Sequence, residues 1–141
     1  MWCDWQESDN PVYNRLMDQF ENHVVKYSKG GSYETRRGKF SRFKSFISFL
    51  SKHYTTEDIR NIQPKHIAAF VRYRRHGGYA EITILSDLSV IRWWLTQIPW
   101  RRFDMPENSQ IFELEARLNE RLYVAEIKEK YRCLKRRRGR I

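Results

Sequence analysis

Residues 35–50, TRRGKFSRFKSFISFL, combine cationic side chains with short hydroxyls at helical spacing. Arginine and lysine neutralise phosphates, and serine and threonine can donate hydrogen bonds to phosphate oxygens or base edges. On a helical wheel the apolar side is formed by Phe40, Phe43, Ile47 and Leu50. The opposite side collects Arg37, Ser41, Arg42, Lys44, Ser45 and Ser48. Two interpretations remain open at this point: a solvated outer face, and a surface that lies against phosphates.

The charge around this stretch is strongly unbalanced. Residues 24–54 contain eight lysines and arginines but a single acidic residue, Glu34. Ordinary surface helices intersperse charges of both signs. The 141-residue chain has a formal net charge of +10, and the C-terminal residues 128–141 form a second basic block. Such a balance predicts a polyanionic partner, either nucleic acid or an anionic membrane. The membrane is disfavoured because apolar runs are short and the aromatics of residues 35–50 fall on the core side.

A second stretch, residues 80–98, has the same layout with fewer charges. Its apolar stripe is Ile84, Leu88, Ile91 and Leu95. The opposite face holds Ser86, Ser89, Arg92, Trp93 and Thr96. Short hydroxyls with one arginine suit a helix that enters a major groove. Trp93 is predicted to point away from the core, which leaves packing under another helix, a protein contact or a stacking surface open for it.

Two further basic clusters are candidates for phosphate contact. The segment RYRRHGG, residues 72–78, ends a predicted helix, where cations are also favoured by the helix dipole alone. Its arginines are Arg72, Arg74 and Arg75. The segment KRRRGR, residues 135–140, is typical of a non-specific electrostatic arm. Its basic residues are Lys135, Arg136, Arg137, Arg138 and Arg140.

Catalytic chemistry has no comparable support. The histidines His23, His53, His66 and His76 lack metal-ligand spacing, and the paired glycines form no phosphate-cradling fingerprint. We therefore predict no enzyme, no metal, no cofactor and no small-molecule substrate. Cys3 and Cys133 are isolated thiols, which favours a reducing, cytoplasmic location. With nucleic acid as the expected partner, we predict association with the nucleoid.

The elements that must position these residues are predicted to be all helical. We expect helices over residues 11–27, 34–53, 64–75, 80–98 and about 109–137, with Pro11 and Pro64 in first turns and Ser109 as an N-cap. Further core stripes are Tyr13, Leu16, Phe20, Val24 and Tyr27, then Ile67, Phe70 and Val71, and lastly Ile111, Leu114, Leu118, Leu122 and Ala125. The expected fold is a compact four- to five-helix bundle with a long C-terminal helix and basic tail. Residues 1–106 would form the domain, and residues 107–141 an extension that packs on it or pairs two copies into a homodimer.

The order of these motifs resembles the N-terminal core-binding, SAM-like domain of tyrosine recombinases and phage integrases. A Phe-x-x-Phe-Leu helix end is matched by Phe46, Phe49 and Leu50, and the next helix by Ile62, Ile67 and Phe70. A third motif is matched by Gly78, Thr83, Ile84, Leu88, Ser89, Ile91 and Arg92. The resemblance covers roughly residues 12–98. Ala80 departs from it, because the family usually has a helix-capping serine there.

The resemblance implies a helical domain that clamps one face of duplex DNA with its second and fourth helices. Carried over by position, it places near DNA Arg36, Arg37, Ser41, Arg42, Lys44, Ser45, Thr83, Ser86, Ser89 and Arg92, and Lys39 belongs to the same basic segment. The family's catalytic domain, with its Arg-His-Arg set and tyrosine nucleophile, has no counterpart here. Residues after 98 contain no histidine, and Tyr123 and Tyr131 lack activating companions.

The leading hypothesis is therefore a stand-alone, sequence-specific DNA-binding regulator or accessory factor of a phage or mobile element. The first alternative is an isolated core-binding fragment of a recombinase. A helical RNA-binding protein is a further alternative, although no RNP-type or KH-type signature supports it.

Overall fold

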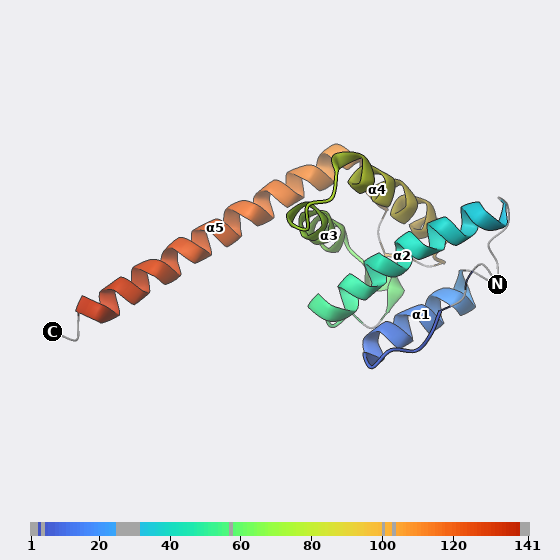
Figure 1. Ribbon diagram of the computed structural model, residues 1–141, viewed down its shortest axis with the longest axis horizontal. Coiled ribbons are helices and arrows are strands. Elements are labelled where there is room, and N and C mark those ends of the chain that lie inside the picture. The colour runs from blue at the N-terminus through green and yellow to red at the C-terminus, as the bar shows by residue number, and fades with distance from the viewer. Residues whose placement is uncertain are drawn as a thin grey trace.

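Every regular element of the described chain is helical. The computed structural model describes residues 3, 5–24, 32–56, 58–99, 101–102 and 104–138. Their elements are α1 (Pro11–His23), α2 (Tyr33–His53), a 3-10 turn η2 (Ile59–Asn61), α3 (Pro64–His76), α4 (Glu81–Leu95) and α5 (Asn108–Arg138). Helices α1 to α4 form a bundle, and α5 runs from its edge far out to one side (Figure 1). The predicted all-α class is thus confirmed.

The helix starts follow from local capping chemistry. Asn10 Oδ1 accepts the Val12 amide at 2.9 Å ahead of Pro11, and Ser32 Oγ accepts the Thr35 amide at 3.2 Å at the start of α2. Pro64 opens α3 as predicted. Ala80 precedes α4 without any side-chain cap, so the departure noted in the sequence leaves this helix start uncapped.

Most predicted helix boundaries lie within one residue of the observed ones, and three of the differences bear on individual predictions. The fourth helix ends at Leu95 rather than residue 98, because Pro99 disfavours helical backbone at Ile98 and turns occupy residues 96–99. The last helix begins at Asn108, and the carbonyl of Glu107 already accepts the Gln110 and Ile111 amides, so Ser109 lies inside the helix rather than at its cap. The first helix ends at residue 23; residues 25–27, including Tyr27, lie outside the described part.

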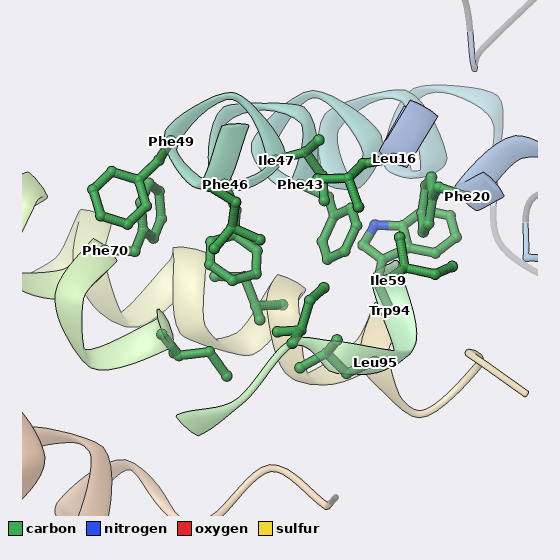
Figure 2. Close-up of a cluster of buried hydrophobic side chains, with 14 of the residues drawn as sticks. Leu16, Phe20, Phe43, Phe46, Ile47, Phe49, Ile59, Phe70, Trp94 and Leu95 are labelled. Atoms are coloured by element: carbon green, nitrogen blue, oxygen red, sulfur yellow. The ribbon is translucent and has the colours of Figure 1, made fainter. Parts of the chain in front are cut away.

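One aromatic cluster joins α1, α2 and α4. Phe20 stacks on Phe43 at 4.6 Å between ring centroids and meets the edge of Trp94 at 4.9 Å (Figure 2). The predicted stripes of the first four helices are confirmed, with Tyr13 half-buried and the following residues buried: Leu16, Phe20, Val24, Phe40, Phe43, Ile47, Leu50, Ile67, Phe70, Val71, Ile84, Leu88, Ile91 and Leu95. The sequence stripe of α4 omitted Trp94, which is fully buried.

Helix α5 belongs to the core only at its start. Ile111 is fully buried, and Leu114 and Leu118 are half-buried against the core where α5 packs on α3. Further along the predicted stripe, Leu122 and Ala125 are exposed. At 1.5 Å per residue the 31 residues of α5 span about 46 Å. The second half of the helix therefore projects beyond the bundle, as the predicted length implied (Figure 1).

Candidate nucleic-acid interface

The outer face of α2 presents the predicted cations and hydroxyls to solvent. Arg37 and Ser41 are exposed, and Lys44 and Ser45 lie half-buried beside them, while the phenylalanines of α2 occupy the opposite side. Gly38 sits within this face, and a Cβ placed on it would meet nothing within 4 Å. Open space at this position would let a ligand backbone approach the helix closely.

A buried carboxylate fixes how α2 meets its neighbours. Asp87 of α4 has a side chain only 3% exposed, and it pairs with Arg42 of α2 at 2.9 Å and with Arg74 of α3 at 3.2 Å. Arg74 is also held between the rings of Phe70 and Tyr79, at 4.9 Å and 4.5 Å from its guanidinium carbon. The side chain of Arg42 remains 41% exposed. Asp87 thus anchors Arg42 at the surface and keeps Arg74 inside the α2–α3–α4 junction.

Trp93 joins α4 to α2. The Nζ of Lys39 lies 4.0 Å from the centroid of the Trp93 ring, and that ring meets the edge of Trp94 at 4.4 Å between centroids. Trp93 is half-buried. Packing beneath a neighbouring helix, one of the options that the sequence left open, is the arrangement observed. Lys39 is therefore a contact between α2 and α4 that retains partial exposure.

The outer face of α4 is nearly uncharged and partly apolar. Ser89 is exposed, Thr83 and Ser86 are half-buried, and the Ser86 hydroxyl donates to the Ile82 carbonyl at 2.9 Å. Ile82 and Leu85 are 74% and 40% exposed on the same side. Sequence reasoning missed these two residues, although their position outside the Ile84 stripe was a usable signal. Exposed methyl groups next to hydroxyls suit contact with thymine methyls in a major groove.

Besides Arg74, three further arginines that were predicted to contact DNA are engaged within the chain. Arg92 donates to the carbonyls of Met105 and Pro106 at 3.3 Å and 2.9 Å, and to Asn108 Oδ1 at 2.6 Å. Arg72 Nε donates to Asn119 Oδ1 at 2.8 Å. A helical wheel shows which side a residue faces but not which partner another helix brings to it, so these contacts were not foreseen.

Arg75 forms the third of these intramolecular anchors. It donates to buried Glu115 at 3.0 Å and also pairs with Glu81. Glu115 and, to a smaller extent, Glu81 raise the pKa of Arg75 above its ordinary value. Glu115 is therefore the anchor that ties α5 to α3. We leave Arg72, Arg74, Arg75 and Arg92 out of the proposed interface.

A small basic hollow extends the α2 face toward its C-terminal end. It is lined by Ser45, Ser48, Phe49, Lys52, His53, Phe70, Tyr73 and Arg74. Lys52 and His53 are exposed at the end of α2, and Tyr73 is 49% exposed beside them. The predicted site omitted Lys52 and His53 because the predicted basic face of α2 ended at Ser48. Tyr73 was omitted because only the arginines of residues 72–78 were considered as phosphate contacts.

The structure describes only part of the predicted basic tail. Lys135 and Arg136 are exposed on α5, and Arg137 and Arg138 belong to the same helix. The side chains of Arg137 and Arg138, and all of Arg140, lie outside the described residues. Arg36 is half-buried near the start of α2. All of these residues stay predictions as phosphate contacts.

His66 has a structural role in the bundle. His66 is buried, its Nδ1 accepts the Gln63 amide at 2.9 Å, and burial, with Lys65 nearby, lowers its pKa to about 4. In the described part of the chain, no group of His, Cys, Asp and Glu side chains could hold a metal ion. Among the same residues, no helix combines the length and the apolar character needed to cross a bilayer.

The structure is that of an all-helical domain, with a basic, hydroxyl-rich face on α2 beside the nearly uncharged outer face of α4. Residues 17–97 match the family described as Phage integrase, N-terminal SAM-like domain. The match spans more than half of the chain, which therefore belongs to this family, as the resemblance predicted. It covers α2, α3 and α4 and ends before α5, and no catalytic domain is part of it. No curated protein sequence and no solved structure matched the chain.

Proposed function

We propose that this recombinase-related domain binds double-stranded DNA through the outer faces of α2 and α4. The observation that carries the proposal is the contrast on α2 between a buried phenylalanine side and an outer side built from cations, hydroxyls and an open glycine. Arg37 and Arg42 would contact phosphates, and Ser41 and Ser45 would reach phosphate oxygens or base edges. On α4, Ser89 with Ile82 would approach the bases of an adjacent groove.

The family and the charge support a regulator or accessory factor of a phage or mobile element, acting at the nucleoid. Phosphate contacts would supply most of the affinity, and α4 would supply any sequence preference. Basic side chains at the end of α5, Lys135 and Arg136 among them, would add a sequence-independent term. Pairing of two copies through Ile111, Leu114 and Leu118 has little room, because these residues already pack on α3.

A second candidate is the core-binding part of a tyrosine recombinase, which the family match favours directly. Both candidates would bind DNA through the same surface. They differ in whether the domain acts alone or together with a recombinase catalytic domain. A reading frame that continues past Ile141 into an Arg-His-Arg and tyrosine set would establish the second. A binding preference shown by this chain alone would favour the first.

The experiment that tests the proposed surface is a titration of a fluorescent 30-base-pair duplex with the full chain, followed by anisotropy. Arg37→Ala should weaken binding about three- to tenfold and lower the salt slope by about one, because one phosphate contact is lost. Arg117→Ala removes the same charge from an exposed position on α5 and is the matched control. Equal effects of the two variants would show that only net charge matters. Tighter binding of single-stranded RNA would favour the RNA alternative.

A further inference from the structure

The second half of α5 carries an apolar seam on its exposed surface. Its members are Val124, Ile127, Tyr131 and Leu134, which are 43%, 47%, 65% and 56% exposed. Their 3-4-3 spacing is that of the a and d positions of a heptad. Solvent-exposed apolar side chains in a continuous stripe, unlike scattered ones, mark an interaction surface.

This seam is distinct from the stripe that packs on α3. At 100° per residue, the centre of Val124, Ile127, Tyr131 and Leu134 lies about half a turn around the helix from the centre of Ile111, Leu114 and Leu118. The two stripes also occupy different halves of α5, and the second half lies beyond the bundle (Figure 1). The bundle of the same chain therefore does not cover the seam.

The flanks of the seam are basic. With Val124 and Tyr131 at a positions, the neighbouring e and g positions hold Lys128, Lys130 and Lys135. Within the part of the chain that the structure describes, no ion pair engages Lys128 or Lys135.

The acids of the same segment lie on the far side of α5. Glu126 pairs with Lys130 at 4.0 Å, and Glu129 pairs with Arg132 at 3.8 Å. Glu126 thus partly neutralises Lys130, whereas Lys128 and Lys135 keep the flanks of the seam positive.

The charges select among possible occupants. In a coiled coil with a second copy, the flanking lysines would face lysines in either helix orientation, which is unfavourable. Duplex DNA would neutralise the lysines but leave the four apolar side chains without an apolar surface to contact.

We propose that the seam Val124–Ile127–Tyr131–Leu134 docks an acidic amphipathic helix of a partner protein. The partner helix would present Ile or Leu side chains to the seam and Glu or Asp side chains to Lys128, Lys130 and Lys135. Apolar burial would supply affinity, and charge complementarity would fix the partner and the register. Because the second half of α5 projects beyond the bundle (Figure 1), the domain could be recruited to a second protein while α2 and α4 contact DNA.

The direct probe is a fluorescent 28-residue synthetic peptide of four heptads, with Ile at a, Leu at d and Glu at every e and g position. Anisotropy is measured with the full chain at about 150 mM salt. The account expects saturable binding with a Kd of about 1–50 µM. A peptide with Gln in place of every Glu should bind at least fivefold more weakly, and one with Lys in place of Glu should not bind. Equal affinity for all three peptides would overturn the charge argument.

Variants separate the seam from the rest of α5. The double variant Ile127→Ser/Leu134→Ser should weaken peptide binding at least tenfold. Leu122→Ser is the matched control, because Leu122 is 43% exposed on the opposite side of α5, and it should bind the peptide unchanged. Circular dichroism and DNA binding should be the same for all three proteins, so failure of the seam is distinguishable from failure of the DNA interface.

Two measurements test the rival occupants. Sedimentation of the full chain should show a monomer up to about 100 µM, and vesicles of phosphatidylserine and phosphatidylcholine should bind the double variant as well as the parent chain. Self-association abolished by Ile127→Ser/Leu134→Ser would replace the proposal with a dimer. Vesicle binding that depends on the same two residues would replace it with a membrane surface.

Discussion

The outer face of α2 and the junction of α3, α4 and α5 have similar basic sequences and different roles. Both regions place arginines near the end or on the outer side of a helix. On α2, Arg37 faces solvent, whereas at the junction Arg75 meets Glu115 and Arg92 meets the carbonyls before α5. An arginine is available to a ligand when the fold leaves its guanidinium exposed and brings it few acceptors, as at Arg37 and, with one carboxylate beside it, at Arg42. The nearest acceptors, and not the local sequence, therefore separate binding arginines from structural ones.

The largest effect is expected where the two regions share a residue, at Asp87. Asp87→Asn removes the charge between Arg42 and Arg74 and leaves Arg74 in a buried site without its counter-charge. The free energy of unfolding should fall by about 2–4 kcal/mol, measured by urea denaturation. Asp104→Asn, an exposed acid paired with Arg101, is the control and should change it by less than about 0.5 kcal/mol. An Asp87→Asn protein as stable as the parent chain would show that the buried carboxylate does not hold α2, α3 and α4 together.

Arg92→Ala tests the junction side of the comparison. It removes three hydrogen bonds that tie α4 to the start of α5, so the free energy of unfolding should fall by about 1–3 kcal/mol. DNA affinity of the folded variant should stay within about twofold of the parent chain. Weaker DNA binding at unchanged stability would return Arg92 to the interface that the sequence predicted for it.

Acid should weaken the bundle through His66. Its pKa is lowered to about 4 in the folded chain from an ordinary value of 6.5, so the unfolded chain binds more protons between these values. The contribution of His66 is therefore complete above pH 6.5 and is lost as the pH falls toward 4. We expect a loss of about 1–2 kcal/mol over this range. His66→Gln keeps an acceptor for the Gln63 amide and should flatten the dependence; an unchanged pH profile would assign it to other groups.

Gly38→Ala has the smallest expected effect and sharpens the assignment of the α2 face. Because a Cβ at this position meets nothing within 4 Å, alanine should raise the free energy of unfolding by about 0.5–1 kcal/mol. If DNA approaches the helix closely at this point, affinity should fall about twofold to fivefold despite the more stable fold. A rise in both the free energy of unfolding and the DNA affinity would place Gly38 away from the bound DNA.

The sequence predicted the fold well because amphipathic periodicity and proline positions act locally. Pro11 and Pro64 mark helix starts, and the stripes of α2 and α4 match the buried residues. The end of α4 was placed too late, because the pattern continues through Ile98 although the backbone turns before Pro99.

The candidate site was less predictable, since it depends on long-range partners. The contacts of Arg72 with Asn119 and of Arg75 with Glu115 join residues forty or more positions apart in the chain. Such information is absent from any single helical wheel.

The central claim, that the α2–α4 face binds duplex DNA with a sequence preference, is tested most directly by selection from a random duplex library at about 150 mM salt. Purely electrostatic binding is already weak at this ionic strength. The full chain should enrich a defined motif, Arg37→Ala should enrich the same motif more weakly, and Ile82→Ala/Ser89→Ala should lose it while keeping its fold. Recovery of no motif, or of the same motif at equal strength by Ile82→Ala/Ser89→Ala, would contradict the account.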